Sequence, residues 1–251
     1  MFSKTAFSAL MGAALMLSAA SAQAAPWTFI GDALAQASGG HTLTNASTFD
    51  DDAPLADGAL NLTGNDPLMT GLDFESALGY APGAFDLSPV LQATEGSAMW
   101  SMFTVQAGQT LSFDWQLSTR DVGDGVGNDY AFVSIGDTLV TLGSASQATQ
   151  PGQGSFLAQT GWQSFSHTFA QAGTYRVALG VVDVGDFAAS TALSVGVVTA
   201  VPEPEAVAMM LADARDSQAW ASRFSVLMSG AMRNIELGLC GAEDFRMAGF
   251  R

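Results

Sequence analysis

The chain of 251 residues is poor in cysteine, histidine and lysine. Its one cysteine, Cys240, can form no disulfide within the chain, so a packed core must hold the protein together. The histidines are His41 and His167, and the sequence has no nucleophile-elbow motif and no histidine cluster typical of catalytic metal sites. We therefore expect no enzyme activity. A glycan hydrolase is the distant alternative, because its paired carboxylates are recognised only by their separation in space.

Positive charge is equally scarce. The chain has 24 Asp and Glu residues against 8 Lys and Arg, a net charge of −16. Residues 25–200 contain 17 of the acids but only two bases, Arg120 and Arg176, and the single lysine is Lys4. Such a surface repels phosphate backbones, which excludes nucleic acid as a partner. It suits a neutral polysaccharide, divalent cations or solubility outside the cell.

The N-terminal segment has the three parts of a signal peptide. Lys4 gives a positive start, residues 6–20 form an apolar run too short for a stable membrane span, and Ala22-Gln23-Ala24 is an A-x-A cleavage site. We predict that residues 1–24 are removed, so that the mature chain begins at Ala25 and is exported. A buried N-terminal helix is the alternative for this run.

Residues 25–200 have the pattern of an all-β domain. Short runs of strand-forming residues recur between clusters of Gly, Asn, Asp and Pro, which is typical of a sandwich or a barrel. We predict an antiparallel β-sandwich, jelly-roll-like in its connections. The predicted strands are 27–30, 41–44, 59–63, 99–105, 110–118, 130–135, 138–142, 162–169, 174–182 and 192–199.

Two of these runs indicate how many faces of the strand are buried. Segment 110–118 alternates large hydrophobes with polar residues, so it should bury one face. In 174–182 the second alternating set is also small or apolar, as in a strand covered on both sides. The hydrophobes of the first segment are Leu111, Phe113, Trp115 and Leu117.

One short helix is predicted over 72–78, where apolar residues recur at helical spacing and Gly79 occupies the position of a C-terminal cap. A helix of about two turns is too short to be stable alone, so it must pack on the sheet.

The tetrapeptide Val201-Pro202-Glu203-Pro204 closes this domain. Each proline fixes φ, removes a backbone donor and restricts the residue before it, so a strand arriving through 192–199 must end here. Preceded by a signal peptide and a β domain, and followed by an apolar start within 201–212, the tetrapeptide resembles the PEP-CTERM sorting signal. That resemblance implies a Gram-negative bacterium, an exosortase-type sorting machinery as partner and a link to exopolysaccharide. A proline-rich linker is the alternative.

The domain is also similar to a class of bacterial exported domains that precede PEP-CTERM tails. The similarity covers residues 72–204, and the class has no defined activity to carry over. Such domains often end on a strand with an Asp-Asn pair, which is absent here. Together the resemblances imply an exported, non-catalytic cell-surface or extracellular-matrix protein associated with exopolysaccharide or biofilm. The motifs are ATEGSA (93–98), AGQTLSFDW (107–115), NDYAFVSI (128–135), GWQSF (161–165) and GVVDVGD (180–186).

Residues 213–251 depart from that family. Its members continue into a membrane-spanning helix and a run of arginines, whereas here charged residues interrupt the apolar start at 213–216 and no arginine cluster follows. Each charge in the hydrocarbon costs about 2.5–3.5 kcal/mol. We therefore predict an impaired anchor and only transient contact with the membrane. A reading-frame slip and a soluble amphipathic helix around 206–232 are the two explanations.

Acidic segments offer ligands for a hard cation. Carboxylate and amide oxygens on a flexible backbone suit Ca²⁺, although the spacing is not that of an EF-hand. Tight turns require the same residue types, so a structural role is the alternative. A calcium-dependent carbohydrate-binding module is thus a second candidate function. The candidate ligands are Glu95, Asp121, Asp124, Asn128, Asp129, Asp183 and Asp186.

Aromatic side chains could form a sugar site, since sugar-binding sandwiches present aromatic faces beside polar loops. Burial is the commoner role of any one aromatic residue. Trp115 shares a face with Phe113, which predicts a core position. Trp100 lies opposite Phe103 in the alternation of its strand, so it is our candidate for an exposed carbohydrate contact. The available aromatics are Trp27, Trp100, Trp115, Trp162, Tyr80 and Tyr130.

Overall fold

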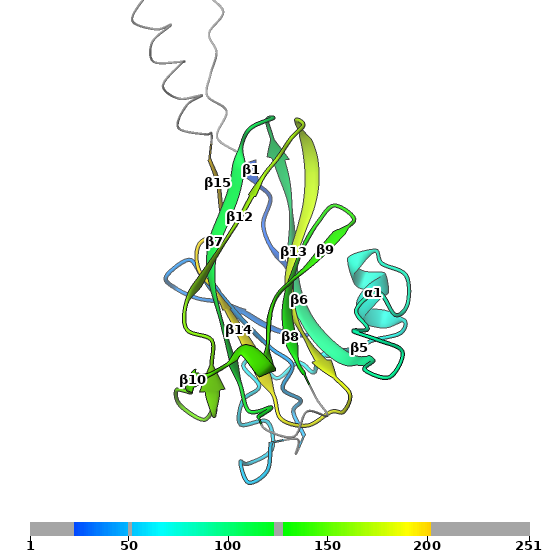
Figure 1. Ribbon diagram of the computed structural model, residues 1–251, viewed down its shortest axis with the longest axis vertical. Coiled ribbons are helices and arrows are strands. Elements are labelled where there is room, and N and C mark those ends of the chain that lie inside the picture. Colours follow the sequence, from blue (N-terminus) through cyan, green and yellow to red (C-terminus); the bar gives the residue numbers. More distant parts are fainter. Residues whose placement is uncertain (1–22, 50–51, 123–127, 202–251) are drawn as a thin grey trace, which may run out of the picture. The chain divides into compact units, whose positions relative to one another are not determined.

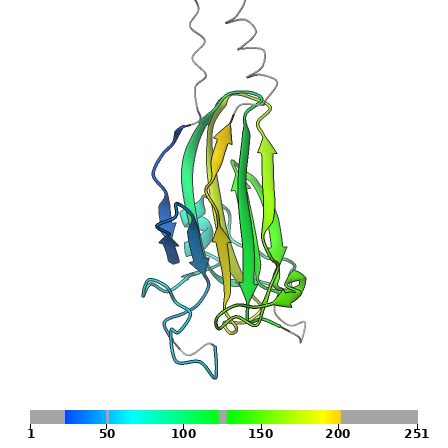
Figure 2. The ribbon, with the colours of Figure 1, turned by 90° about the vertical axis from the view of Figure 1, so that its left-hand side faces the viewer.

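The computed structural model describes residues 23–49, 52–122 and 128–201, which belong to one compact unit. Two antiparallel sheets pack face to face in this unit, so the predicted β-sandwich is confirmed (Figures 1 and 2). Residues 1–22 of the predicted signal peptide and the whole segment 202–251 lie outside the described residues. The described part of the chain contains no helix long and apolar enough to cross a membrane.

The first sheet has seven strands in the order β1-β6-β13-β8-β9, and β2 and β5 also pair with β6. Its long central strands, β6 and β13, pair along most of their length. The bounds are Gln23–Ala24 for β1, Thr28–Ile30 for β2, Leu68–Met69 for β5, Ala93–Val105 for β6, Tyr130–Ile135 for β8, Thr138–Ser144 for β9 and Gly173–Val184 for β13.

The second sheet has eight strands in the order β10-β11-β7-β14-β4-β3, and β12 and β15 also pair with β7. From β6 onward the chain passes back and forth between the sheets, which is the jelly-roll-like connection. A 3₁₀ turn, η1, spans Ala145–Gln147. The strand bounds are Asp32–Ala35 for β3, His41–Thr44 for β4, Thr110–Thr119 for β7, Gln150–Pro151 for β10, Ala158–Gln159 for β11, Gln163–Thr168 for β12, Thr191–Val195 for β14 and Thr199–Val201 for β15.

The main core lies between the two sheets. Every second residue of β7 is buried there, as its alternation predicts, and the same holds for one alternating set of β13. The large hydrophobes meet across the interface and leave little water-accessible surface, which makes this burial the main source of stability. The facing sets are Leu111, Phe113, Trp115 and Leu117 on β7, and Val177, Leu179 and Val181 on β13.

A second apolar cluster covers the outer face of the seven-stranded sheet. Helix α1, Asp73–Leu78, lies there beside β6 (Figure 1), with Phe74 and Leu78 buried. Phe74 meets the ring of Phe85 at 5.1 Å and that of Phe132 at 6.2 Å. Gly79 ends the helix in the left-handed conformation at φ 77°. The predicted helix, its cap and the coverage of both faces of β13 are therefore confirmed.

Two predicted strands are wrong. Segment 59–63 forms turns, because the backbone N–H groups of Leu62 and Thr63 each donate to the carboxylate of Asp32 at 2.8 Å rather than to a neighbouring strand. The run 192–199 forms two strands, β14 and β15, separated by three residues. The sequence does not predict β1, β3, β5, β10 or β11, which are two to four residues long, and β1 lies at the end of the predicted signal peptide.

We expect Phe74→Ala to lower the free energy of unfolding by about 3–5 kcal/mol, because Phe74 is fully buried and its removal leaves a cavity between the helix and the sheet. Urea unfolding of the two proteins measures the difference. The matched control is Leu72→Ala, since Leu72 is 73% exposed at the start of the same helix and its truncation should cost less than about 0.5 kcal/mol. Equal losses in both variants would contradict the packing described here.

Candidate functional site

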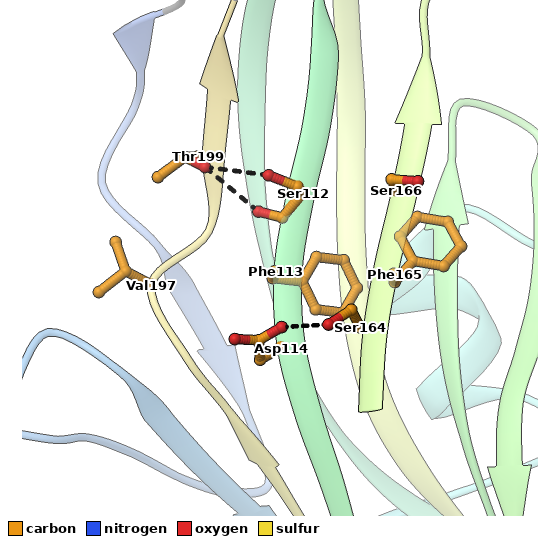
Figure 3. Close-up of a pocket in the computed structure, with 8 residues that line it drawn as sticks. All are labelled: Ser112, Phe113, Asp114, Ser164, Phe165, Ser166, Val197 and Thr199. Carbon is orange, nitrogen blue, oxygen red and sulfur yellow. Dashed lines mark hydrogen bonds between the residues drawn. The ribbon is translucent and has the colours of Figure 1, made fainter. Parts of the chain in front are cut away.

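The outer face of the eight-stranded sheet is hollowed between β12, β7 and β15. The hollow has a volume of about 430 Å³ (Figure 3). Alternation along these strands turns the aromatic rings of Phe113 and Phe165 toward the core, where they stack at 5.1 Å, and turns the polar set outward. The residues that line the hollow are Ser112, Phe113, Asp114, Ser164, Phe165, Ser166, Val197 and Thr199.

A second hollow of about 270 Å³ adjoins the first, because Val197 borders both. It extends across β14 toward β4 and the connection between β3 and β4. The two hollows are neighbours on this face, and we call them together the outer groove. The second hollow is lined by Gln36, Ser38, Gly40, His41, Thr42, Trp162, Ser194, Val195, Gly196 and Val197.

Trp162 is the exposed aromatic residue of the outer groove, with 59% of its surface accessible. It directly precedes β12, whose first residue, Gln163, pairs with the inward-facing Trp115. The neighbouring Trp162 is therefore on the outer face. Gly161 precedes it at φ 70°, a conformation that favours glycine. The local backbone thus presents a large indole over a sheet surface whose outward side chains are mostly polar.

Val197 reaches the groove through a β-bulge. Val195 pairs with Trp115 and Thr199 pairs with Ser112, so the segment between β14 and β15 has one residue more than the stretch of β7 that it follows. The N–H of Gly196 still donates to the carbonyl of Asp114 at 2.8 Å. The bulge leaves Val197 57% exposed at the border of the two hollows.

Polar groups of the first hollow are paired across the strands. The hydroxyl of Ser164 donates to the Asp114 carboxylate at 2.6 Å, and the hydroxyls of Ser112 and Thr199 lie 3.2 Å apart (Figure 3). Asp114 is the one charged residue among those that line the groove. The surface therefore offers an indole, several hydroxyls and a single carboxylate, which can recognise a ligand that has both apolar faces and hydroxyl groups.

Trp100, the predicted carbohydrate contact, lies elsewhere. It belongs to the outer face of the seven-stranded sheet, beside the cluster under α1, and is half-buried. The guanidinium of Arg176 stands over its ring, 4.1 Å from the centroid, and donates to the carbonyl of Ala77 at 2.7 Å. The residue that sequence reasoning did not single out is Trp162. The sequence held a signal for this position. Trp162 falls in the same alternating set as the polar Ser164 and Ser166, and Phe165 falls in the other set.

Three of the predicted cation ligands come together inside one end of the sandwich. Val182 pairs with both Gly96 and Tyr130, so the next residue of β13, Asp183, stands between Glu95 of β6 and Asp129 before β8. All three acids are buried. The carboxylate of Asp129 accepts from the side chains of Asn45 at 2.8 Å and Thr191 at 2.6 Å, and from the N–H of Val184 at 3.1 Å.

The other predicted ligands serve nearby turns or are not described. Asp121 accepts from the N–H of Asp129 at 3.3 Å, Asp186 accepts from the N–H of Ala188 at 2.8 Å, and Asn128 accepts from the N–H of Ser146 at 3.2 Å. Asp124 lies outside the described residues. Of the sorting motif, Val201 ends β15 opposite Thr110, and Pro202, Glu203 and Pro204 lie outside the described residues.

Burial and mutual repulsion disfavour ionisation of this acid group. Burial is the main cause that raises the pKa of Asp183 to about 10, and the charges of Asp129, Asp186 and Glu95 raise it further. Burial likewise raises the pKa of Asp129 to about 7, although its hydrogen bonds from Thr191 and Asn45 act in the opposite direction. A neutralising partner, either a proton or a cation, would relieve this repulsion.

A metal ion cannot be held here by side chains alone. Among the described residues, no three His, Cys, Asp or Glu side chains are grouped so that they could bind one. The oxygen donors are nevertheless of the type that Ca²⁺ takes, and Ca²⁺ completes its shell with backbone carbonyls and water.

The two histidines differ in environment. His41 is buried on β4, with ring centroids 5.6 Å from Trp27 and 5.8 Å from Phe29, and its Nδ1 accepts or donates no hydrogen bond within the described part of the chain. Burial lowers the pKa of His41 below its ordinary value of 6.5. His167 on β12 is exposed and packs edge-on against Phe169 at 5.0 Å.

Comparison with known proteins gives no family assignment. No protein-family model matches the chain, and no curated protein matches it. Among solved structures, TmCBM61 in complex with β-1,4-galactotriose is 10% identical, with 45% of this chain and 70% of that chain covered at a TM-score of 0.26. A structure titled "CBM4 structure and function" is 11% identical, with 48% and 83% covered at a TM-score of 0.19. The ligand named in the first title is a property of that protein.

We expect acid to destabilise this protein partly through His41. Because its pKa is lowered in the folded state, the unfolded state binds the proton more tightly; the stability gained from the neutral imidazole is present above pH 6.5 and lost as the pH falls through that range. His41→Phe keeps a ring beside Trp27 and removes the titration. The melting temperature should therefore fall more between pH 7 and pH 5 in the natural protein than in the variant. The exposed His167→Phe is the control, and it should behave like the natural protein. An unchanged pH response in His41→Phe would show that His41 is not the cause.

Proposed function

We propose that this chain is an exported, non-catalytic protein that binds neutral polysaccharide through the outer groove. The observation that carries the proposal is the exposed indole of Trp162 beside a polar, hydroxyl-lined sheet surface. A sugar ring has an apolar C–H face and an equatorial rim of hydroxyls. The first packs on an aromatic ring and the second exchanges hydrogen bonds with Ser, Thr and carboxylate groups.

Charge favours a neutral glycan over an acidic one. Asp114 is the charged residue of the groove, and the chain as a whole has a net charge of −16. An anionic polymer such as a uronic-acid polysaccharide would be repelled during its approach.

The groove favours binding over hydrolysis. Glycoside hydrolysis uses two carboxyl groups on opposite sides of the scissile bond. Asp114 is the one acid among the residues that line the groove. The acids Glu95, Asp129 and Asp183 are buried within the sandwich, where a polymer has no access.

The proposed place of action is the cell surface or extracellular matrix, in association with exopolysaccharide or biofilm. It is supported by the signal peptide that the sequence predicts at residues 1–24, by the acidic composition and by the resemblance of Val201-Pro202-Glu203-Pro204 to the PEP-CTERM signal. An exosortase-type machinery is the proposed sorting partner. The charged segment 213–216 supports release from the membrane rather than lasting anchorage.

Trp162→Ala tests the groove. Affinity electrophoresis of the protein through gels containing β-1,4-galactan, laminarin, xylan or hydroxyethyl cellulose should show retardation by at least one of them. Retardation should weaken about tenfold or more in the variant, a loss of about 1.4 kcal/mol that is typical of a central aromatic contact. Phe187→Ala is the matched control, because Phe187 is an aromatic residue of 50% exposure outside the groove. Retardation by none of the four, or equal retardation of Trp162→Ala and the natural protein, would refute the groove.

Export has its own test. In a Gram-negative host, the protein recovered outside the cytoplasm should begin at Ala25 when its N-terminus is sequenced by mass spectrometry, since cleavage follows Ala24. Ala22→Arg and Ala24→Arg remove the small residues that the cleavage site needs, so the double variant should accumulate uncleaved. Uncleaved, cytoplasmic natural protein would overturn the proposed localisation.

A further inference from the structure

A long stretch of this acidic chain contains no charged residue. Residues 138–175 include no Asp, Glu, Lys or Arg, although the whole chain has 24 acids and 8 bases. The stretch covers β9, η1, β10, β11 and β12 and ends at the start of β13. These elements therefore give the molecule a neutral surface, while the chain as a whole has a net charge of −16.

The neutral elements lie along one side of the sandwich. β9 is the last strand of its sheet, and β12 lies on the side of β7 away from β14, because Trp115 of β7 pairs with both Gln163 and Val195. β9 lies opposite this border of the other sheet, since a Cβ added to Gly143 would come within 2.6 Å of the Trp115 ring. We call the side formed by β9 and β12 the neutral side. Figure 2 shows β12, in yellow-green, at the border of its sheet.

The sandwich is open along the neutral side. On β12, Gln163 and His167 pair with inward-facing residues of β7, so both belong to the inner face, yet both are exposed. On β9, Val140 pairs with the buried Val133 of the inner core and is 40% exposed. The inner layer of the sandwich is therefore accessible to a partner from this side.

β12 is the edge strand that lacks the usual features that prevent pairing with another chain. An edge strand presents N–H and C=O groups without a strand partner, and proteins block such edges by shortness, charge, proline or bulges. Among the described edge strands, β1, β2, β3, β5, β10 and β15 have two to four residues, β10 includes Pro151, and the pairing of β9 has a register shift beside Ala131. β12 has six residues in regular register with β7, without charge or proline.

We propose that β12 pairs antiparallel with β12 of a second copy of this chain, across a two-fold axis. Two copies with a net charge of −16 each repel one another, so self-contact is least unfavourable where both surfaces are neutral. A cationic partner, in contrast, would be attracted to the acidic surfaces elsewhere on the chain. A two-fold contact joins the same patch on both copies, and a strand paired antiparallel with itself meets that requirement.

Strand geometry determines which residues meet in this contact. Successive side chains alternate between faces, so a contact that continues the sheet places inner residues opposite inner residues. Centred on the half-buried Phe165, it brings the two Phe165 rings together and places Gln163 opposite His167 of the partner subunit. The axis is perpendicular to the sheet, so both outer grooves lie on one face of the dimer. This inference goes beyond the proposed function and does not rest on it.

Sedimentation velocity of the full-length protein tests the contact, in a reducing buffer so that Cys240 forms no disulfide between copies. We expect a dimer fraction that rises with concentration, with a Kd of about 10⁻⁶–10⁻⁴ M, as suits an interface of small area. His167→Glu adds a charge to the exposed edge and should raise this Kd about tenfold or more. Gln163→Glu is the second variant, in case the first fails to fold.

Ala35→Glu is the matched control. It adds the same charge at an exposed position of β3, the opposite edge of the same sheet, and should leave the Kd unchanged. Hydrogen exchange gives a second readout, because strand pairing protects backbone amides. Amides of residues 163–168 should exchange more slowly at high than at low protein concentration, whereas those of 32–35 should exchange equally.

Three results would overturn the proposal. The first is a monomer at every concentration up to about 5 × 10⁻⁴ M, about five times the weakest Kd expected. The second is a dimer whose Kd is unchanged in both His167→Glu and Gln163→Glu, and the third is exchange at 163–168 that does not depend on concentration. Because these measurements involve no polysaccharide, failure here is separate from failure of the groove.

Discussion

The structure depends on the closure of two apolar sheet faces against each other. The inner residues of β7 and β13 exclude water only when the sheets stack, and this burial holds together a domain that has no disulfide. This burial also decides the outer surface, because successive side chains of a strand point to opposite faces of the sheet. Burying Phe113 and Trp115 therefore places Ser112 and Asp114 on the outer face, where the outer groove forms.

The two outer faces are used differently. On the seven-stranded sheet, α1 and the loop around Phe85 cover a second apolar cluster, and Trp100 is held there under Arg176. On the eight-stranded sheet the outer set is polar and remains uncovered over the groove, with Trp162 as its aromatic group. The residues that point outward from each sheet, apolar on one and mostly polar on the other, thus decide which outer face becomes a second core and which remains open.

Two irregularities in strand pairing adapt this regular frame. The bulge between β14 and β15 turns Val197 into the outer groove, and the register shift in β6 places Thr94 and Glu95 opposite Asp183. The first shapes a surface and the second concentrates carboxylates in the interior. The two irregularities lie on different sheets of one sandwich.

The local features can be predicted from the sequence: the β class, most long strands, the alternation of β7, and the helix before Gly79, because each follows from side-chain period or from a capping residue. Glu95, Asp129 and Asp183 were also candidates from their residue types. Three other outcomes follow from long-range packing: Glu95, Asp129 and Asp183 are neighbours, Trp162 is exposed while Trp100 is covered, and 59–63 is not a strand. Those outcomes depend on register, on coverage of a face and on a distant carboxylate, Asp32, that takes the backbone donors. All three are set by residues far apart in the chain, which a local pattern cannot record.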